Sequence, residues 1–190
     1  MRLKAEEFAP GQYYHIYNHS VAEQVLFRDE NDYLRCLKII KRYYNATDYS
    51  ILAYCLMPNH YHFLIYQKTG VPVYESFRNI WYCYTCYYNK KYGRKGTLFA
   101  NKLQHIGIKD ANYILHLCAY IHHNPVKARL VDTPELWKWS NYPDWIGIRN
   151  GKLIDKEQTK DFFKTSDEYK ECVSSIMPDD MDKKSLFDFE

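Results

Sequence analysis

The sequence lacks any run of about 18 consecutive apolar residues, the length that an α-helix needs to span a bilayer. The first ten residues, MRLKAEEFAP, lack the apolar core of a secretory signal. Internal repeats and low-complexity tracts are also absent. We therefore expect a cytoplasmic protein without a membrane partner, in which the six cysteines are reduced thiols.

Acidic residues are missing from the whole stretch between Glu75 and Asp110. The same stretch carries seven positive charges, from Arg78, Lys90, Lys91, Arg94, Lys95, Lys102 and Lys109. A long segment of one charge sign indicates a polyanionic partner such as a nucleic acid, although a solvated helix face has the same composition. Tyrosine is frequent, with 20 residues, which suits stacking on bases as well as an ordinary core.

Charge also divides the chain near residue 150. Residues 1–150 carry 19 Lys and Arg against 12 Asp and Glu, whereas residues 151–190 carry 7 against 11. With 46% hydrophobic residues, the chain can build a substantial core. We expect one domain over residues 1–149 and an acidic, partly helical C-terminal extension over residues 150–190, with the last dozen residues loose.

Hydrophobic periodicity predicts secondary structure in the order β-α-β-β-α-β-α. The predicted strands cover residues 12–21, 49–56, 60–67 and 97–108. The predicted helices cover residues 29–44, 73–92 and 111–124, and Pro125 ends or kinks the last of them. Two crossovers around a short hairpin indicate an α+β, ferredoxin-like fold: a four-stranded antiparallel sheet with helices on one face and an appended C-terminal segment. The tryptophan-rich WKWSNYPDW (137–145) is expected to cover a sheet edge.

The segment MPNHYHFL (57–64) places two histidines one residue apart in a predicted strand. Alternate residues of a strand share a face, so His60 and His62 project together. Such a pair is either a coincidence of surface composition or part of a metal site.

The predicted helix 111–124 offers partners for these histidines. An apolar stripe belongs against the sheet and consists of Ile114, Leu117, Cys118 and Ile121. Tyr120 and Asn124 lie one turn apart on another face. If that face meets the histidine strand, two imidazoles and an amide oxygen form a three-ligand cation site beside a phenol nucleophile. His122 and His123 also fit a ligand spacing, but they point away from the face of Tyr120.

Several blocks of the sequence, in this order, resemble the IS200-like single-tyrosine transposases, and in particular their REP-associated branch. The blocks are YYHIYNHSV with FRDENDYLR, YCLMPNHYHFLI, NKKYGRKGTLF and YIHHNPVKARLV, and they cover about residues 10–145. His60-Tyr61-His62 matches the HUH motif of that family, and YIHHNPV matches its helix with the catalytic tyrosine. The resemblance implies Tyr120 as the nucleophile and His60, His62 and Asn124 as ligands of Mg²⁺ or Mn²⁺.

The resemblance further implies an enzyme whose HUH domain occupies residues 1–149. Such an enzyme cleaves and rejoins single-stranded DNA near hairpins through a 5′-phosphotyrosine intermediate, in DNA transposition, as a monomer or a homodimer. We predict DNA contacts from the basic segment and its neighbours, while Trp81 and Tyr84 are expected in the core. The predicted DNA-binding residues are Arg78, Lys90, Lys91, Arg94, Lys95, Lys102, His105 and Lys127.

Two blocks differ from the family pattern. After GTLF the chain reads ANKLQHI instead of a glutamine-glycine-arginine-tyrosine run, and Tyr17-Asn18-His19-Ser20 stands where the family has tyrosine-asparagine-arginine-glycine. These differences affect expected DNA contacts rather than the metal ligands. Two other functions stay open: a catalytically silent, domesticated protein that binds DNA or RNA hairpins, and a zinc hydrolase that uses His60 and His62.

Overall fold

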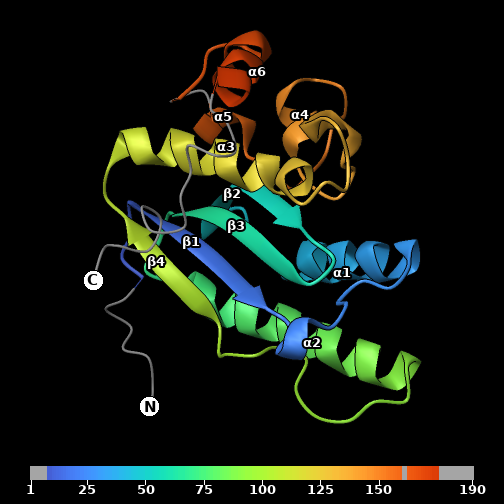
Figure 1. The fold of residues 1–190 in the computed structure, drawn as a ribbon. Coiled ribbons are helices and arrows are strands. Elements are labelled where there is room, and N and C mark those ends of the chain that lie inside the picture. Colours follow the sequence, from blue (N-terminus) through green and yellow to red (C-terminus); the bar gives the residue numbers. More distant parts are fainter. Residues whose placement is uncertain (1–7, 160–161, 176–190) are drawn as a thin grey trace.

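A single four-stranded sheet forms the centre of the computed structural model, which describes residues 8–159 and 162–175 (Figure 1). All strand pairs are antiparallel, in the order β2-β3-β1-β4. The strands are β1 (Gln12–His19), β2 (Tyr49–Leu56), β3 (His60–Gln67) and β4 (Gln104–Ile108). The predicted α+β class and four-stranded antiparallel sheet are confirmed.

Helices cover both faces of this sheet. The two crossover helices, α1 (Glu30–Tyr43) and α2 (Val73–Lys91), lie together on one face, and α3 (Ala111–Lys127) crosses the other (Figure 1). The expectation of helices on one face therefore holds for α1 and α2 and is wrong for α3. The physical reason is that β2 and β3 are buried on both sides, so both faces of the sheet must be covered.

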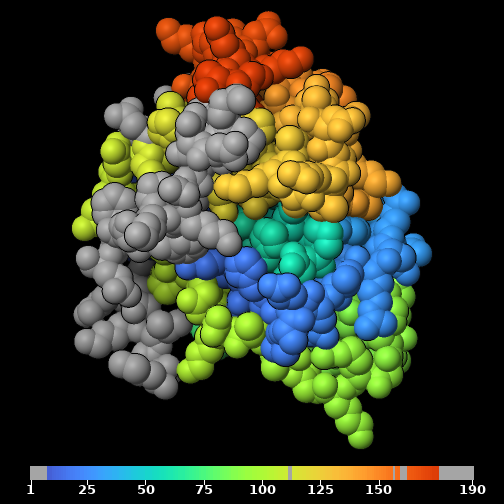
Figure 2. All heavy atoms as spheres, viewed as in Figure 1, coloured from blue at the N-terminus to red at the C-terminus, as the bar shows by residue number. Residues whose placement is uncertain are grey.

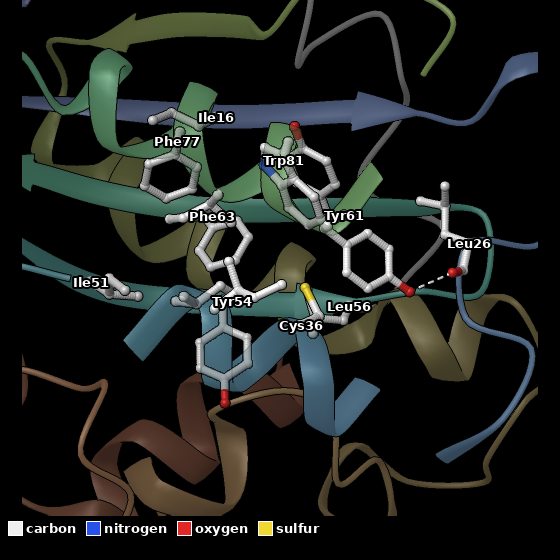
Figure 3. Close-up of a cluster of buried hydrophobic side chains, with 14 of the residues drawn as sticks. Ile16, Leu26, Cys36, Ile51, Tyr54, Leu56, Tyr61, Phe63, Phe77 and Trp81 are labelled. Atoms are coloured by element: carbon white, nitrogen blue, oxygen red, sulfur yellow. Dashed lines mark hydrogen bonds between the residues drawn. The ribbon is translucent and has the colours of Figure 1, made fainter. Parts of the chain in front are cut away.

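Aromatic side chains dominate the core between the sheet and the two crossover helices (Figure 3). The ring of Tyr61 stacks on Trp81 with centroids 3.8 Å apart, and Phe63 meets Phe77 edge to face at 4.9 Å. Trp81 and Tyr84 are 5% and 0% exposed, which confirms that they belong to the core.

The opposite face is covered by α3 and by C-terminal elements. The predicted stripe of α3 is buried, and it shares its core with Tyr169 and Val173 of α6 (Ser166–Ser175). The small helices expected in the extension are α5 (Lys156–Thr159) and α6, while its last dozen residues lie outside the described part. Among the described helices, none combines the length and apolar character needed to cross a bilayer.

The tryptophan-rich segment covers the open edge of β2, as predicted. The short helix η3 (Pro134–Leu136) precedes it, and the short helix α4 (Tyr142–Trp145) forms its end. The indole of Trp137 donates to the Leu56 carbonyl at 3.2 Å, and the Trp145 indole donates to Leu52 O at 2.8 Å. Leu52 lies at a bulge of β2, so these contacts satisfy backbone carbonyls that the sheet edge leaves unpaired.

Some element boundaries differ from the predicted ones. The last strand begins at Gln104 rather than residue 97. Before it, Phe99 forms only an isolated bridge with Ser20, and Asn18 Nδ2 donates to the carbonyls of Asn101 and Lys102. The first strand ends at His19 and is followed by the 3₁₀ helix η2 (Val21–Glu23). Helix α3 continues past Pro125 to Lys127, since a proline in the last turn removes only one backbone donor.

Candidate active site

Two histidines of β3 meet the second half of α3 on the sheet face that α3 covers. The buried stripe of α3 fixes the rotation of the helix, so that Tyr120 and Asn124 face β3. The Nε2 atom of His60 lies 3.4 Å from Asn124 Oδ1. The ring of His62 meets the Tyr120 ring edge to face, with centroids 5.6 Å apart. The structure therefore brings together the four residues that the sequence indicated.

These four residues lie near one end of the sheet. In the β1–β3 ladder, His60 is paired with His19 and His62 with Tyr17, both close to the end of β1. The β2–β3 connection just before His60 reaches the surface between the C-terminal elements and the segment that follows β1 (Figure 2). A long ligand could therefore approach this end of the sheet.

The imidazole of His62 is buried against a second histidine. His15 Nε2 lies 2.9 Å from His62 Nδ1, and the two rings meet edge to edge, with centroids 5.1 Å apart and planes only 20° apart. Burial lowers the pKa of His62 well below its usual value, and the nearby His15, His60 and His19 add to this effect. Burial also lowers the pKa of His15 to about 3. Both rings are therefore neutral at neutral pH, the state in which an imidazole binds a cation.

The outer contacts of His60 and Asn124 leave two acceptor atoms facing each other. His60 Nδ1 lies 2.8 Å from Asn59 Oδ1, so the ring proton belongs on Nδ1. Asn124 Nδ2 donates to the carbonyl of Tyr120 at 2.8 Å, which orients Asn124 Oδ1 toward His60. Two lone pairs that converge in this way suit a cation between them.

Clusters of charged, imidazole or thiol ligands bear on where a cation could bind in the described part of the chain. Within residues 8–159 and 162–175, no three His, Cys, Asp or Glu side chains gather in a metal-binding arrangement. The amide oxygen of Asn124 is a ligand type outside this set, and it lies 3.4 Å from His60 Nε2.

The phenol of Tyr120 is half-buried beside this pair of ligands. Burial raises the pKa of the Tyr120 phenol, while the side chain of Asn124 lowers it by a smaller amount. The phenol is thus protonated at neutral pH, and it needs a cation or a base to become a nucleophile.

The other histidines of α3 have structural roles. His122 is buried, with Nε2 2.9 Å from Asn141 Oδ1 and Nδ1 in contact with the Tyr169 hydroxyl. His123 Nε2 donates to the carbonyl of Val173 at 2.7 Å. Both rings therefore connect α3 to the C-terminal elements, away from His60 and His62.

One site residue was missed by the sequence analysis. His15 alternates with Tyr17 and His19 along β1, so all three project on the face of β1 that carries the site. That alternation was visible in the sequence. The register that places His15 Nε2 next to His62 Nδ1 was not, because it depends on how β1 pairs with β3.

The predicted DNA-binding residues fall into different environments. Lys91 binds carboxylates of its own chain, with Nζ 2.6 Å from Asp32 Oδ1 and 2.8 Å from Asp29 Oδ2. Its charge is therefore neutralised within the fold, and we leave Lys91 out of the proposed DNA contacts. Arg94 donates to Asn89 Oδ1 at 3.1 Å and lies over the Tyr88 ring.

The remaining predicted contacts lie on several surfaces. Lys90 lines a hollow between α1 and α2, on the face opposite the histidines. His105 lines a cleft of about 480 Å³ beside the edge strand β4. The cleft extends as far as Tyr113 of α3. Lys95 lies on the exposed turn after α2, and Lys127 is exposed in the last turn of α3.

Arg78 and Lys102 share one groove of about 400 Å³, which we call the α2 groove. It lies between α2 and residues 97–103, and its walls are largely aromatic, from Tyr61, Tyr74, Trp81, Tyr82 and Phe99. Asn18 and Tyr61, which also line it, are paired strand residues directly adjacent to the pair His19 and His60. The groove and the histidines thus occupy opposite faces of the same end of the sheet.

Comparison with solved structures supports this fold. A REP-associated tyrosine transposase bound to a REP hairpin superposes with a TM-score of 0.63 and 17% identity, covering 78% of this chain and 90% of that chain. A second structure, tRNA(His) guanylyltransferase from Saccharomyces cerevisiae, covers 93% of this chain and 83% of that one, with 14% identity and a TM-score of 0.45, too low to support an argument.

Comparison of sequences identifies the family. No curated protein matches the chain. The profile of the family described as "Transposase IS200 like" matches residues 9–124, which include His60, His62, Tyr120 and Asn124. This match covers more than half of the sequence. The chain belongs to the IS200-like transposase family.

Proposed function

We propose that this protein is a metal-dependent tyrosine transposase that cleaves and rejoins single-stranded DNA near hairpins. The observation that carries the proposal is the convergence of His60, His62 and Asn124 with the Tyr120 phenol, from two elements far apart in the sequence. The match of residues 9–124 to the transposase family supports it. So does the similarity to a transposase structure that contains a REP hairpin.

The ligand set suits Mg²⁺ or Mn²⁺. With its ring proton on Nδ1, His60 presents an unprotonated Nε2 to Asn124 Oδ1 at 3.4 Å, and neither atom then donates to the other. A cation held by these atoms and by His62 resolves that contact. When bound, such a cation polarises a phosphodiester and offsets the charge that develops during displacement.

Tyr120 is the group of this chain that reacts with DNA in the proposed mechanism. Its phenol loses a proton, and the oxygen forms a bond to the phosphorus of a phosphodiester as the bond from phosphorus to the 3′ oxygen breaks. The leaving 3′ oxygen takes up a proton, and the 5′ end stays attached to Tyr120 as a phosphotyrosine. Attack by a 3′ hydroxyl on that phosphotyrosine reverses these steps and rejoins a strand.

The DNA strand is proposed to reach the α2 groove at the same end of the sheet. Lys102 and Arg78 border aromatic walls there, a combination that suits phosphates and stacked, unpaired bases. Arg78 also forms an ion pair with Glu75, so Lys102 is the more available charge. Lys95, on the exposed turn after α2, extends the positive surface beyond the groove.

Metal removal is the direct test of the proposed chemistry. Incubation with labelled single-stranded hairpin DNA from the flanks of its own gene is expected to give a covalent protein–DNA adduct with Mn²⁺ and none with EDTA, seen on a denaturing gel. An adduct that forms in EDTA would refute the metal dependence. Tight binding without an adduct would favour a hairpin-binding protein, and metal-dependent cleavage without an adduct would favour a hydrolase.

Replacement of Lys102 tests the DNA contact. Lys102→Ala is expected to weaken binding of single-stranded DNA and to make the slope of log affinity against log salt shallower by about 1, because one phosphate contact is lost. Lys41→Ala, at an exposed position in the last turn of α1, removes the same charge away from the groove and serves as the control. Equal slopes for the two variants, measured by fluorescence anisotropy, would remove Lys102 from the contacts.

A further inference from the structure

We propose that His15 is a positioning residue that fixes the tautomer and orientation of His62. In this arrangement His62 donates its Nδ1 proton to His15 Nε2, and the Nε2 lone pair of His62 is left for a cation. The inference rests on the proposed function for the direction of the proton, because a cation at His62 requires a lone pair on Nε2. It adds a residue of β1 to a site built from β3 and α3.

The geometry between the two rings carries the inference. His15 Nε2 and His62 Nδ1 are 2.9 Å apart, a normal hydrogen-bond distance, so one ring donates and the other accepts. His62 is 3% exposed and His15 is 2% exposed. Water is therefore poorly placed to replace His15 as the partner of His62 Nδ1.

The direction of the proton follows from the needs of a metal site. If His15 were the donor, the proton of neutral His62 would sit on Nε2, and that atom could not bind a cation. If His62 donates, Nε2 carries a lone pair. Histidines that bind metals nearly always donate their other ring proton to a neighbouring acceptor, which sets the tautomer and the ring plane.

The packing around His15 fits a fixed acceptor. Its ring is stacked against Tyr17 on one side, with centroids 4.8 Å apart and planes at 26°, and its plane lies within 20° of the His62 plane, as an in-plane hydrogen bond requires. In β1, His15 pairs with Leu64 and is thus diagonal to His62 across the ladder. His60 has the corresponding contact from its own loop, because its Nδ1 lies 2.8 Å from Asn59 Oδ1. The Nδ1 atoms of His60 and His62 thus each have a partner, Asn59 for His60 and His15 for His62.

The tautomer of His62 can be measured in the full chain without metal. Long-range ¹H–¹⁵N correlation spectra separate Nδ1–H from Nε2–H imidazoles, and a His62→Gln sample identifies the signals of His62. We expect Nδ1–H in the wild-type protein and a shift toward Nε2–H in His15→Leu, which removes the acceptor. His15→Gln places an amide oxygen near the position of Nε2 and is expected to retain Nδ1–H.

Mn²⁺ binding supplies the second readout, from the paramagnetic resonance signal of free Mn²⁺. His15→Leu is expected to weaken affinity by about tenfold or more, and His15→Gln by less than about threefold. An Nε2–H tautomer in the wild-type protein, or unchanged Mn²⁺ affinity in His15→Leu, would overturn the proposal. If His15→Leu does not fold, the tautomer of His62 in the wild-type protein still tests the proposal, because Nδ1–H supports it and Nε2–H overturns it. If the wild-type protein binds no Mn²⁺, the metal part of the proposed function fails, whereas the tautomer still decides whether His15 orients His62.

Discussion

Tyr120→Phe is expected to abolish the covalent protein–DNA adduct while DNA binding stays close to that of the wild-type protein. The phenyl ring retains the edge-to-face contact with His62 and the position on α3, and only the nucleophilic oxygen is lost. Because the phenol oxygen is the attacking atom in the proposed reaction, the loss should be complete on a denaturing gel. Anisotropy with the same hairpin DNA measures the binding.

Tyr113→Phe is the matched control, because Tyr113 lies two turns earlier on α3 and is also partly buried. This variant should form the adduct as the wild-type protein does. Mass spectrometry of the digested adduct should place the nucleotide on Tyr120. An adduct in Tyr120→Phe, or its disappearance in Tyr113→Phe, would mean that the nucleophile has been misassigned.

Asp32→Asn is expected to lower the free energy of unfolding by about 3 kcal/mol, the largest effect on stability that we predict. Asp32 is 0% exposed, and its carboxylate accepts from Lys91 Nζ at 2.6 Å, from the hydroxyls of Tyr92 and Tyr87 at 2.7 and 3.0 Å, and from the Arg28 backbone at 2.8 Å. An amide in this place loses the charge and points an N–H group at donors. Urea unfolding measures the change.

Asp29→Asn provides the comparison for this variant. Asp29 also binds Lys91, but its side chain is 47% exposed, and asparagine caps α1 as well as aspartate does. We expect a loss below about 1 kcal/mol. If both variants lose the same free energy of unfolding, burial of the Asp32 carboxylate is not the cause of the loss in Asp32→Asn.

The stability that Asp32 contributes should depend on pH. Burial by itself raises the pKa of Asp32, but hydrogen bonds from Lys91, Tyr92, Arg28 and Tyr87 outweigh it, and the net pKa lies below its usual value. A carboxyl with a lowered pKa in the folded state binds its proton more weakly there than in the unfolded state. Its contribution is therefore complete above about pH 4 and is lost as the pH falls through the lower, folded value. The gap between wild type and Asp32→Asn should narrow below pH 4.

Much of the fold was predictable because it depends on local patterns. The order of strands and helices follows from hydrophobic periodicity, and the apolar stripe of α3 indicated which side of that helix meets the sheet. The spacing of His60 with His62, and of Tyr120 with Asn124, placed each pair on one face of its element. These are properties of a strand or a helix by itself, so neighbours in sequence determine them.

The charge pattern was less informative than it looked in the sequence. No acidic residue occurs between Glu75 and Asp110, yet Asp29, the N-cap of α1, and Asp32, in its first turn, lie against Lys91 at the end of α2. Helix packing brings these carboxylates to the basic segment from about sixty positions earlier in the chain. Lys91 has no acidic neighbour in its own stretch of the sequence, but the fold pairs it with two carboxylates. Lys102 therefore stays a candidate for DNA contact, and Lys91 does not.

The sequence by itself determined the family, the antiparallel α+β arrangement and the residue types of the site. Only the tertiary structure decided that α3 covers the face opposite α1 and α2, that His15 contacts His62, and that His122 and His123 bind the C-terminal elements. Each of these depends on strand register or on the packing of elements distant in the chain. Local patterns assign each strand residue to a face, but a slip of two residues keeps every face, so these patterns do not select one pairing by themselves.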